Sequence, residues 1–258
     1  MTDLDRQEWI EDAKGWIEQQ PPRHGVEPPF DITLYHQRPW SYVLLTSTVH
    51  GDFYFKAVQP EFRHEVRVTE GLAERWPNLV SAPIASDAER GWLLLPDGGL
   101  RLREAASDNA LPGHWRQLLP IHAEMQRALA SETDWMLALG VSDRRPQSLP
   151  GRLKALAREP MIAGGDLPSA LQPAEKRSWL NLLARLPELC EALAEFGIPA
   201  SLNHGDLHDG NIFMNGGSHR ILDWGDCSLA HPFFRYELFR SAWRIGSVGP
   251  RETLESAR

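Results

Sequence analysis

The stretch Asn203-His-Gly-Asp-Leu-His-Asp-Gly-Asn-Ile-Phe213, followed by Arg220-Ile-Leu-Asp-Trp-Gly225, determines how this chain is interpreted. Asp206 and Asn211 are five residues apart, and Asp223 comes twelve residues after Asn211. Two short apolar runs separated by Asn-Gly-Gly-Ser lie between them, which is the pattern of a β-hairpin. Because a hairpin returns the chain to its starting end, we expect Asn211 and Asp223 to converge. Their oxygen atoms are ligands that suit Mg²⁺, and Mg²⁺ also binds phosphates.

The two motifs together resemble those of the aminoglycoside phosphotransferase family, the small-molecule relatives of protein kinases. The kinase pattern H-R-D-x-x-x-x-N has the spacing of Asp206 and Asn211, and Asp223-Trp-Gly stands where a kinase has D-F-G. Either motif alone would be weak, but the pair in this order is specific. The resemblance covers roughly residues 30–245. It implies an α+β, protein-kinase-like fold with a small antiparallel-sheet lobe and a mostly helical large lobe.

The resemblance also implies roles for the polar residues of this stretch. Asp206 would be the catalytic residue, because phosphoryl transfer needs a carboxylate that orients the acceptor hydroxyl and takes its proton. Asn211 and Asp223 would bind Mg²⁺. An isolated Asp in His-Gly-Asp could equally cap a turn, so the assignment depends on the two metal ligands that follow. Three further residues are expected to support the site or to face the substrate: His204, His208 and Asp226.

A lysine interrupts an apolar strand in the N-terminal part of the chain. Residues 53–58, Phe-Tyr-Phe-Lys-Ala-Val, are apolar on both faces except for Lys56, and a buried charge is costly unless it is paired. The helix expected over 62–76 carries an apolar stripe, with Glu65 beside it near the helix start. We therefore expect Lys56 to pair with Glu65, which the resemblance makes a phosphate-binding pair. The alternatives are a solvated pair of side chains, or Glu70 as the partner, about 100° from the centre of the stripe.

A break at Pro96-Asp-Gly-Gly99 divides the expected architecture into an N-terminal nucleotide-binding lobe, 1–96, and a C-terminal catalytic lobe, 97–258. By the resemblance, the backbone at Leu95 and Asp97 would pair with the nucleotide base; the alternative is a simple turn. The segment from 36 to 41, where protein kinases carry a glycine-rich loop, contains no glycine. Ser41 is the candidate phosphate contact there.

The remaining elements follow from hydrophobic periodicity. Helices are expected over 3–19, 113–130, 174–196 and 233–245, and strands over 32–35, 41–48, 53–58, 81–84 and 92–95. Pro120 is expected to kink or restart its helix, and Pro187 to mark a restart.

Composition bounds the class of protein. The chain has 258 residues, 42% hydrophobic and 24% charged, which is typical of a globular protein. A net charge of −8 argues against nucleic-acid binding. Two cysteines without a C-x-x-C pattern fit a reducing compartment. The sequence shows no signal peptide and no apolar run long enough for a membrane span, so we expect a cytoplasmic protein.

The predicted function is transfer of the γ-phosphoryl group of ATP or GTP, with Mg²⁺, to a hydroxyl of a small molecule. By the resemblance, the acceptor would be an aminoglycoside, another antibiotic, an amino alcohol or a sugar; the choice and the oligomeric state stay open. One alternative is a catalytically weak or inactive nucleotide-binding protein on the same fold, because the chain ends about 35 residues after Asp223 and so looks short at its C-terminal end. Another is a zinc hydrolase that uses the cluster of His204, Asp206, His208 and Asp209, with His219 and His231 as possible distant ligands.

Overall fold

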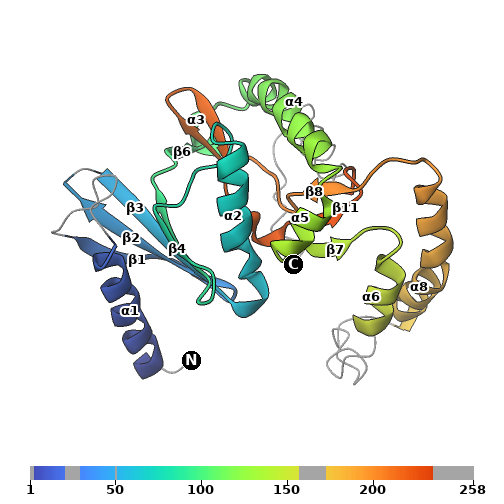
Figure 1. The fold of residues 1–258 in the computed structure, drawn as a ribbon, viewed down its shortest axis with the longest axis horizontal. Coiled ribbons are helices and arrows are strands. Elements are labelled where there is room, and N and C mark those ends of the chain that lie inside the picture. The colour runs from blue at the N-terminus through green and yellow to red at the C-terminus, as the bar shows by residue number, and fades with distance from the viewer. Residues whose placement is uncertain (1–2, 21–29, 50, 157–172, 235–258) are drawn as a thin grey trace.

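The computed structural model describes four segments of the chain: residues 3–20, 30–49, 51–156 and 173–234. Figure 1 shows a lobe built on a twisted sheet and a second lobe built mostly of helices. The closing helix expected over 233–245 lies almost entirely outside the described residues. In the described part of the chain, no helix is both long and apolar enough to cross a membrane.

The small lobe is a five-stranded antiparallel sheet in the order β1-β2-β3-β5-β4. Its strands are β1 (Asp31–Arg38), β2 (Ser41–Thr48), β3 (Gly51–Val58), β4 (Ala85–Asp87) and β5 (Trp92–Pro96). Helix α1 (Asp3–Glu18) packs on one face, where its Ala13 and Ile17 are buried with Phe55 and Trp92. Alternation places these apolar residues on one face and leaves Lys56 on the other.

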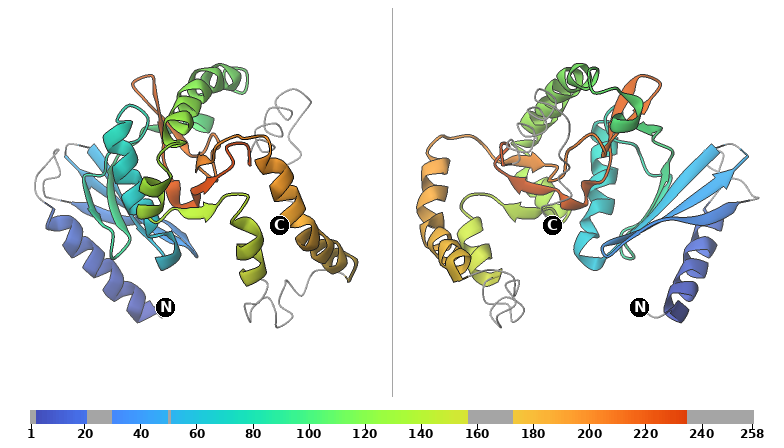
Figure 2. Two further views of the ribbon diagram at one scale, coloured as in Figure 1. Left: turned by 45° about the vertical axis from the view of Figure 1, so that its right-hand side comes forward. Right: turned by 180° about the vertical axis from the view of Figure 1, so that it is seen from behind.

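Helix α2 (His64–Arg75) follows a 3₁₀ turn at Pro60–Phe62 and lies between the sheet and the large lobe (Figures 1 and 2). Its buried side chains include Val68 and Leu72, which belong to the core of the large lobe. Glu65 is also buried, in the first turn, with 2% of its surface exposed. The position of α2 therefore brings one carboxylate to the junction of the two lobes.

The large lobe contains helices α3 (Leu102–Ala105), α4 (Leu111–Leu129), α5 (Thr133–Ala138), α6 (Leu149–Leu156) and α8 (Pro173–Ala194). Two small sheets have the orders β10-β9-β6 and β7-β11-β8. Their strands are β6 (Leu100–Arg101), β7 (Ser142–Arg144), β8 (Ser201–Asn203), β9 (Ile212–Asn215), β10 (Ser218–Ile221) and β11 (Ser228–Ala230). Helices α6 and α8 pack against each other at the end of this lobe farthest from the small-lobe sheet (Figure 2).

Two local predictions were wrong, the strand over 81–84 and the restart at Pro187, whereas the kink at Pro120 stays a prediction. The strand expected over 81–84 forms instead at Ala85–Asp87, because Pro83 has no N–H for a ladder and pairing begins only when Ile84 donates its N–H to Leu94, at 2.7 Å. Pro120 and Pro187 lie inside α4 and α8, which each continue through them as one helix. A proline removes one hydrogen bond, a penalty of about 3 kcal/mol that a long helix with a packed face tolerates.

Candidate active site

Lys56 of the small-lobe sheet forms ion pairs with two carboxylates at the junction of the lobes. Its Nζ lies 2.6 Å from Oε1 of Glu65 on α2 and 2.7 Å from Oδ1 of Asp223. Asp223 lies two residues after the end of β10, the second strand of the β9–β10 hairpin. The side chains of Lys56 and Glu65 are 14% and 3% exposed, whereas Asp223 is 52% exposed. Strand, helix and hairpin therefore deliver one ammonium and two carboxylates to one point. Glu70, the alternative partner, instead accepts a hydrogen bond from the hydroxyl of Ser86.

The electrostatics of these three groups are coupled. Burial raises the pKa of Glu65, and although Lys56 opposes this, Asp223 adds to it, so the value reaches about 7. Burial acts to lower the pKa of Lys56, but the two carboxylates outweigh it and raise the pKa, so the ammonium stays charged. The attraction of Lys56 lowers the pKa of Asp223. One ammonium thus stabilises the two carboxylates unequally, and Asp223 holds its charge more firmly.

The buried side chain of His204 holds the loop that follows β8 in place through hydrogen bonds. This ring is 1% exposed and lies 4.5 Å from the ring of the buried Trp224. Its Nδ1 accepts the N–H of Asp206 at 3.2 Å, so Nε2 carries the proton and donates to the carbonyl of Leu222 at 3.0 Å. Burial lowers the pKa of His204 to about 4. A neutral His204 therefore joins the loop that carries Asp206 to the segment that carries Asp223.

Asp206 is held by two neighbours on its own loop. The side-chain amide of Asn211 donates to the Asp206 carbonyl at 2.9 Å and to its Oδ2 at 3.2 Å. The Nε2 of His208 lies 3.4 Å from the same Oδ2. The Asp206 side chain is 39% exposed, so a substrate can reach it.

Arg103 on α3 is a site residue that the sequence did not indicate. Its Nη2 lies 3.0 Å from Nδ1 of His208 and 2.9 Å from Oδ1 of Asp209, and its backbone N–H donates to the Asp209 carbonyl at 3.2 Å. Nδ1 of His208 also accepts the N–H of Gly210, at 2.9 Å. A nitrogen that accepts these bonds leaves the proton on Nε2, which faces Asp206. Arg103 therefore fixes the side chain beside the candidate base.

Glycines allow the close approaches in this site. At Gly205 φ is +82°, and a Cβ there would lie 2.1 Å from the carbonyl oxygen of Asp226. A Cβ on Gly210 would meet the Arg103 guanidinium at 2.1 Å. Asp226, expected to support the site, thus contacts the catalytic loop through its backbone, while its side chain is exposed. Asp223 adopts φ +67°, a strained conformation for a non-glycine residue that often marks a functional site.

The residues at the hairpin ends fit a magnesium ion. The N–H of Leu222 donates to the Asn211 carbonyl at 3.0 Å, which holds the two ends of the hairpin together as the sequence predicted. Asn211 uses its side-chain nitrogen toward Asp206, so its Oδ1 is the atom that remains to bind a metal. Lys56 occupies only Oδ1 of Asp223. One amide and one carboxylate oxygen match Mg²⁺, which keeps several water ligands and takes few from protein.

The remaining predicted nucleotide contacts lie on the small lobe. Ser41 and Leu95 occupy the same sheet face as Lys56, Ser41 opposite Val58 and Leu95 opposite Tyr54. Ser41 is buried. Asp97 follows β5 and accepts the N–H of Gly99 at 3.0 Å. The nucleotide-binding roles of these residues stay predictions.

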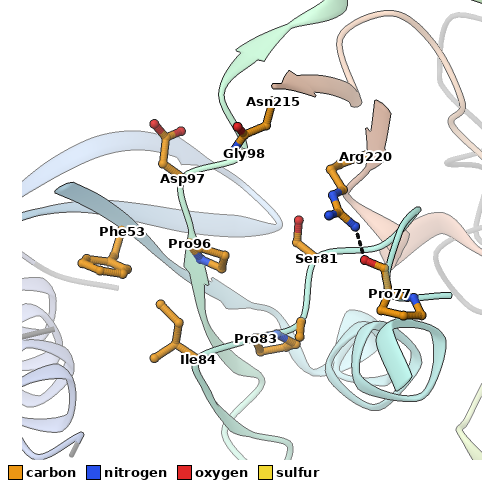
Figure 3. Close-up of a pocket in the computed structure, with 11 residues that line it drawn as sticks. Phe53, Pro77, Ser81, Pro83, Ile84, Pro96, Asp97, Gly98, Asn215 and Arg220 are labelled. Carbon is orange, nitrogen blue, oxygen red and sulfur yellow. Dashed lines mark hydrogen bonds between the residues drawn. The ribbon is translucent and has the colours of Figure 1, made fainter. Parts of the chain in front are cut away.

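Asp97 also lines a cavity of about 380 Å³ at the junction of the lobes (Figure 3). Its walls are the ends of β3 and β5, the segment from Pro77 to Ile84, and the β9–β10 hairpin, where Arg220 donates to the Pro77 carbonyl. Lys56 and Asp223 do not line this cavity. It is therefore separate from the cluster of charged residues.

The zinc interpretation finds little geometric support. Within the described residues, no three His, Cys, Asp or Glu side chains are grouped so that they could hold a metal ion. His219, one of the expected distant ligands, instead faces His114, with Nε2 and Nδ1 3.0 Å apart.

A lysine paired with a helix glutamate, a carboxylate on a partly exposed loop, and an amide and a carboxylate at the ends of a hairpin are the arrangement that phosphotransferases use. A family model described as the phosphotransferase enzyme family matches residues 41–255. The chain therefore belongs to this family. No curated protein sequence matches it.

Solved structures show the same two-lobed, protein-kinase-like fold. A choline kinase from Cryptosporidium parvum Iowa II has a TM-score of 0.60 at 15% identity, covering 86% of this chain and 66% of that one. A proposed aminoglycoside phosphotransferase from Ralstonia eutropha JMP134 has a TM-score of 0.58 at 19% identity, covering 96% and 74%. A thermostable mutant of aminoglycoside phosphotransferase APH(4)-Ia, in a complex with AMP-PNP and hygromycin B, has a TM-score of 0.55 at 13% identity, covering 83% and 70%. The predicted fold class is confirmed.

Proposed function

We propose that this protein transfers the γ-phosphoryl group of ATP or GTP to a hydroxyl group of a small molecule. The observation that carries the proposal is the meeting of Lys56, Glu65 and Asp223 within 2.7 Å at the junction of the lobes. One positive and two negative charges leave this cluster with a formal charge of −1, which suits a divalent cation beside a phosphate group. Asn211 and Asp223 would bind this cation, which would neutralise part of the phosphate charge.

Each residue then has a distinct task. Lys56 binds phosphate oxygens, and Glu65 keeps its ammonium in place. Asp206 accepts a hydrogen bond from the acceptor hydroxyl and takes its proton as the phosphoryl group is transferred. Asn211 holds the Asp206 carboxylate through the 3.2 Å bond from its amide. His204 keeps this loop at a fixed distance from the segment that carries Asp223.

We take the acceptor from the substrate classes after which the structurally similar proteins are named. Aminoglycosides and choline-like amino alcohols are the first candidates, because the similar structures include an aminoglycoside phosphotransferase bound to hygromycin B and choline kinases. Other antibiotics and sugars complete the panel. Nucleotide consumption measured against each of these acceptors, with ATP and with GTP, identifies the substrate.

Two substitutions test the roles directly. Asp206→Asn keeps the shape of the side chain and removes the base, so turnover should fall by roughly 10²–10⁴ while nucleotide still binds. Asp223→Ala removes a metal ligand, so the Kd of a non-hydrolysable ATP analogue in Mg²⁺ should rise along with the loss of turnover. Asp134→Asn, an exposed change on α5, is the matched control.

The outcomes separate the proposal from its alternative. If the wild-type protein binds nucleotide but turns over no acceptor, it is a binding protein on this fold. If Asp223→Ala binds nucleotide in Mg²⁺ as tightly as the wild type, the metal-ligand assignment is wrong.

A further inference from the structure

The β1–β2 hairpin contains no glycine, and alternate side chains along it lie on the side of the sheet that carries Lys56. His36 is directly opposite Val43, and Val43 is directly opposite Lys56. Directly opposite residues project from the same face of a sheet. The His36 side chain therefore lies on the Lys56 face, two strand spacings or roughly 10 Å from it. Arg38, two residues farther along β1, projects from the same face.

The β1 strand contains an irregularity just before His36. The pairing with β2 shifts between Leu34 and His36, which leaves Tyr35 as an extra residue. The Tyr35 ring contacts the ring of Tyr54 edge-on, at 5.3 Å between centroids. Tyr54 is two residues from Lys56 on β3 and shares its face. Bulges of this kind re-aim side chains beside active sites.

Arg101 approaches the same space from the large lobe. It lies on β6 opposite Phe213, with its guanidinium carbon 5.9 Å from the centre of that ring. Its side chain is 42% exposed, and its ion pair with Glu104 is a long one, 3.7 Å. It acts electrostatically on Tyr54 of the small lobe, where it lowers the tyrosine pKa against the larger effect of burial. Arg101 follows the end of β5 by five residues, so it lies where the chain passes from the small lobe to the large lobe.

The charges on the two lobes act together at His36. Burial lowers the pKa of His36, and Arg38, Arg101 and Lys56 lower it further, whereas Asp223 acts in the opposite direction. Cations therefore prevail around this ring. Among the described residues, neither His36 nor Arg38 forms an ion pair with a carboxylate, so their donors are available to an anion.

We propose that Arg38 and Arg101 form a cationic clamp, with the ring of His36 as a further hydrogen-bond donor, which binds the phosphate chain of a nucleoside triphosphate. The clamp takes the place of the backbone amides that a glycine-rich loop would offer. Arginine suits this task because its planar guanidinium matches the geometry of phosphate oxygens. The inference rests on the proposed function, because it concerns the same nucleotide.

The test compares ligands with and without phosphates. Titration calorimetry gives the Kd of a non-hydrolysable ATP analogue and of adenosine for the wild type, Arg38→Gln, Arg101→Gln and the double variant. Loss of one charge-assisted hydrogen bond should raise the Kd of the triphosphate roughly tenfold for each arginine, with adenosine binding unchanged for Arg38→Gln. The salt dependence of triphosphate binding should also become shallower, because fewer charges take part. Arg67→Gln on α2, which removes an exposed partner of Glu89, is the control.

Each outcome decides a different point. A triphosphate Kd that rises in Arg38→Gln and Arg101→Gln but not in Arg67→Gln supports the clamp. If the double variant prefers triphosphate over adenosine as strongly as the wild type does, the clamp is overturned and the proposed function stands. A wild-type protein that binds triphosphate no better than adenosine overturns both.

Discussion

Removing the ammonium of Lys56 tests the physical basis of the site. In Lys56→Met, Glu65 stays buried beside Asp223 without its cation. At 2.6 Å, two unit charges attract by about 6 kcal/mol at an effective dielectric constant of 20. Desolvation offsets much of this, so we expect a net coupling between Lys56 and Glu65 of about 2–3 kcal/mol. The coupling between Lys56 and Asp223 should be below about 1 kcal/mol, because Asp223 is half exposed to screening solvent.

The pH dependence of this penalty follows from the pKa of Glu65. Its folded-state pKa is raised from 4.5 to about 7, so the wild-type carboxyl is ionised at pH 8 and largely protonated below pH 7. Without Lys56, burial and Asp223 both raise the pKa further, and the variant carries the proton even at pH 8. The variant then binds one proton more than the wild type above pH 7. The destabilisation by Lys56→Met should therefore decrease by about 1 kcal/mol from pH 8 to pH 7, by about 0.4 kcal/mol more from pH 7 to pH 6, and change little below that.

The assay is urea unfolding of the wild type, Lys56→Met, Glu65→Gln and the double variant at pH 8, 7 and 6, with the free energy of unfolding extrapolated to zero denaturant. Glu65→Gln removes the titrating group, so the double variant should lose the pH dependence. Additive single effects at pH 8, within about 0.5 kcal/mol, would refute the pairing. A Lys56→Met penalty independent of pH would refute the argument from the Glu65 pKa.

Three further predictions concern the large lobe. Gly205→Ala should destabilise the fold by at least about 1–3 kcal/mol and abolish turnover, because its Cβ would meet a backbone carbonyl at 2.1 Å; a fully active variant in a thermal-unfolding and turnover comparison would contradict this. Arg103→Ala should lower kcat about tenfold with the nucleotide Kd unchanged, and Arg103→Lys should recover part of the loss, because one charge-assisted bond is removed; an unchanged kcat would exclude a positioning role. Burial lowers the pKa of His122 and His204 from 6.5 to about 4, so the stability of the neutral forms is present above pH 6.5 and is lost as pH falls toward 4. The free energy of unfolding should fall in that range by up to about 1.4 kcal/mol per pH unit for each ring, and a flat profile would show that neither ring resists protonation.

The sequence was most informative where a charged residue interrupted an apolar pattern or where a turn joined two short strands. A lysine in the apolar strand Phe53–Val58 required a partner, and the structure supplies Glu65 from the apolar-striped helix that follows. The turn between β9 and β10 predicted that Asn211 and Asp223 would converge, and the hydrogen bond between Leu222 and Asn211 closes that hairpin. Both predictions depended on short sequence separations, which local rules describe well.

The contacts that sequence reasoning missed join distant segments. Arg103 and His208 are 105 residues apart, and an arginine in a polar stretch looks like any solvated side chain. Gly205 and Gly210 can be read in the sequence, but not the reason for a glycine there. That reason is the close approach of the Asp226 carbonyl to Gly205 and of the Arg103 guanidinium to Gly210. The proposed clamp was missed for a similar reason, since it depends on the strand register of His36 and on the place of Arg101 just beyond the end of β5.

Three contacts join the loop of Asp206 to the segment of Asp223: the bond from His204 to Leu222, the bond from Leu222 to Asn211, and the packing of Gly205 on Asp226. These contacts hold the candidate base and the candidate metal ligand at a fixed spacing. Lys56 lies on the small-lobe sheet and meets this unit across a seam, through its 2.7 Å ion pair with Asp223 and its pair with Glu65 on α2, which packs on the large-lobe core. If the lobes part to exchange nucleotide, that seam is where the charge cluster separates, while the spacing between Asp206 and Asp223 is conserved. Under the proposed function, the spacing between the candidate base and the candidate metal ligand would be set during folding, and each opening would change only the distance across the seam.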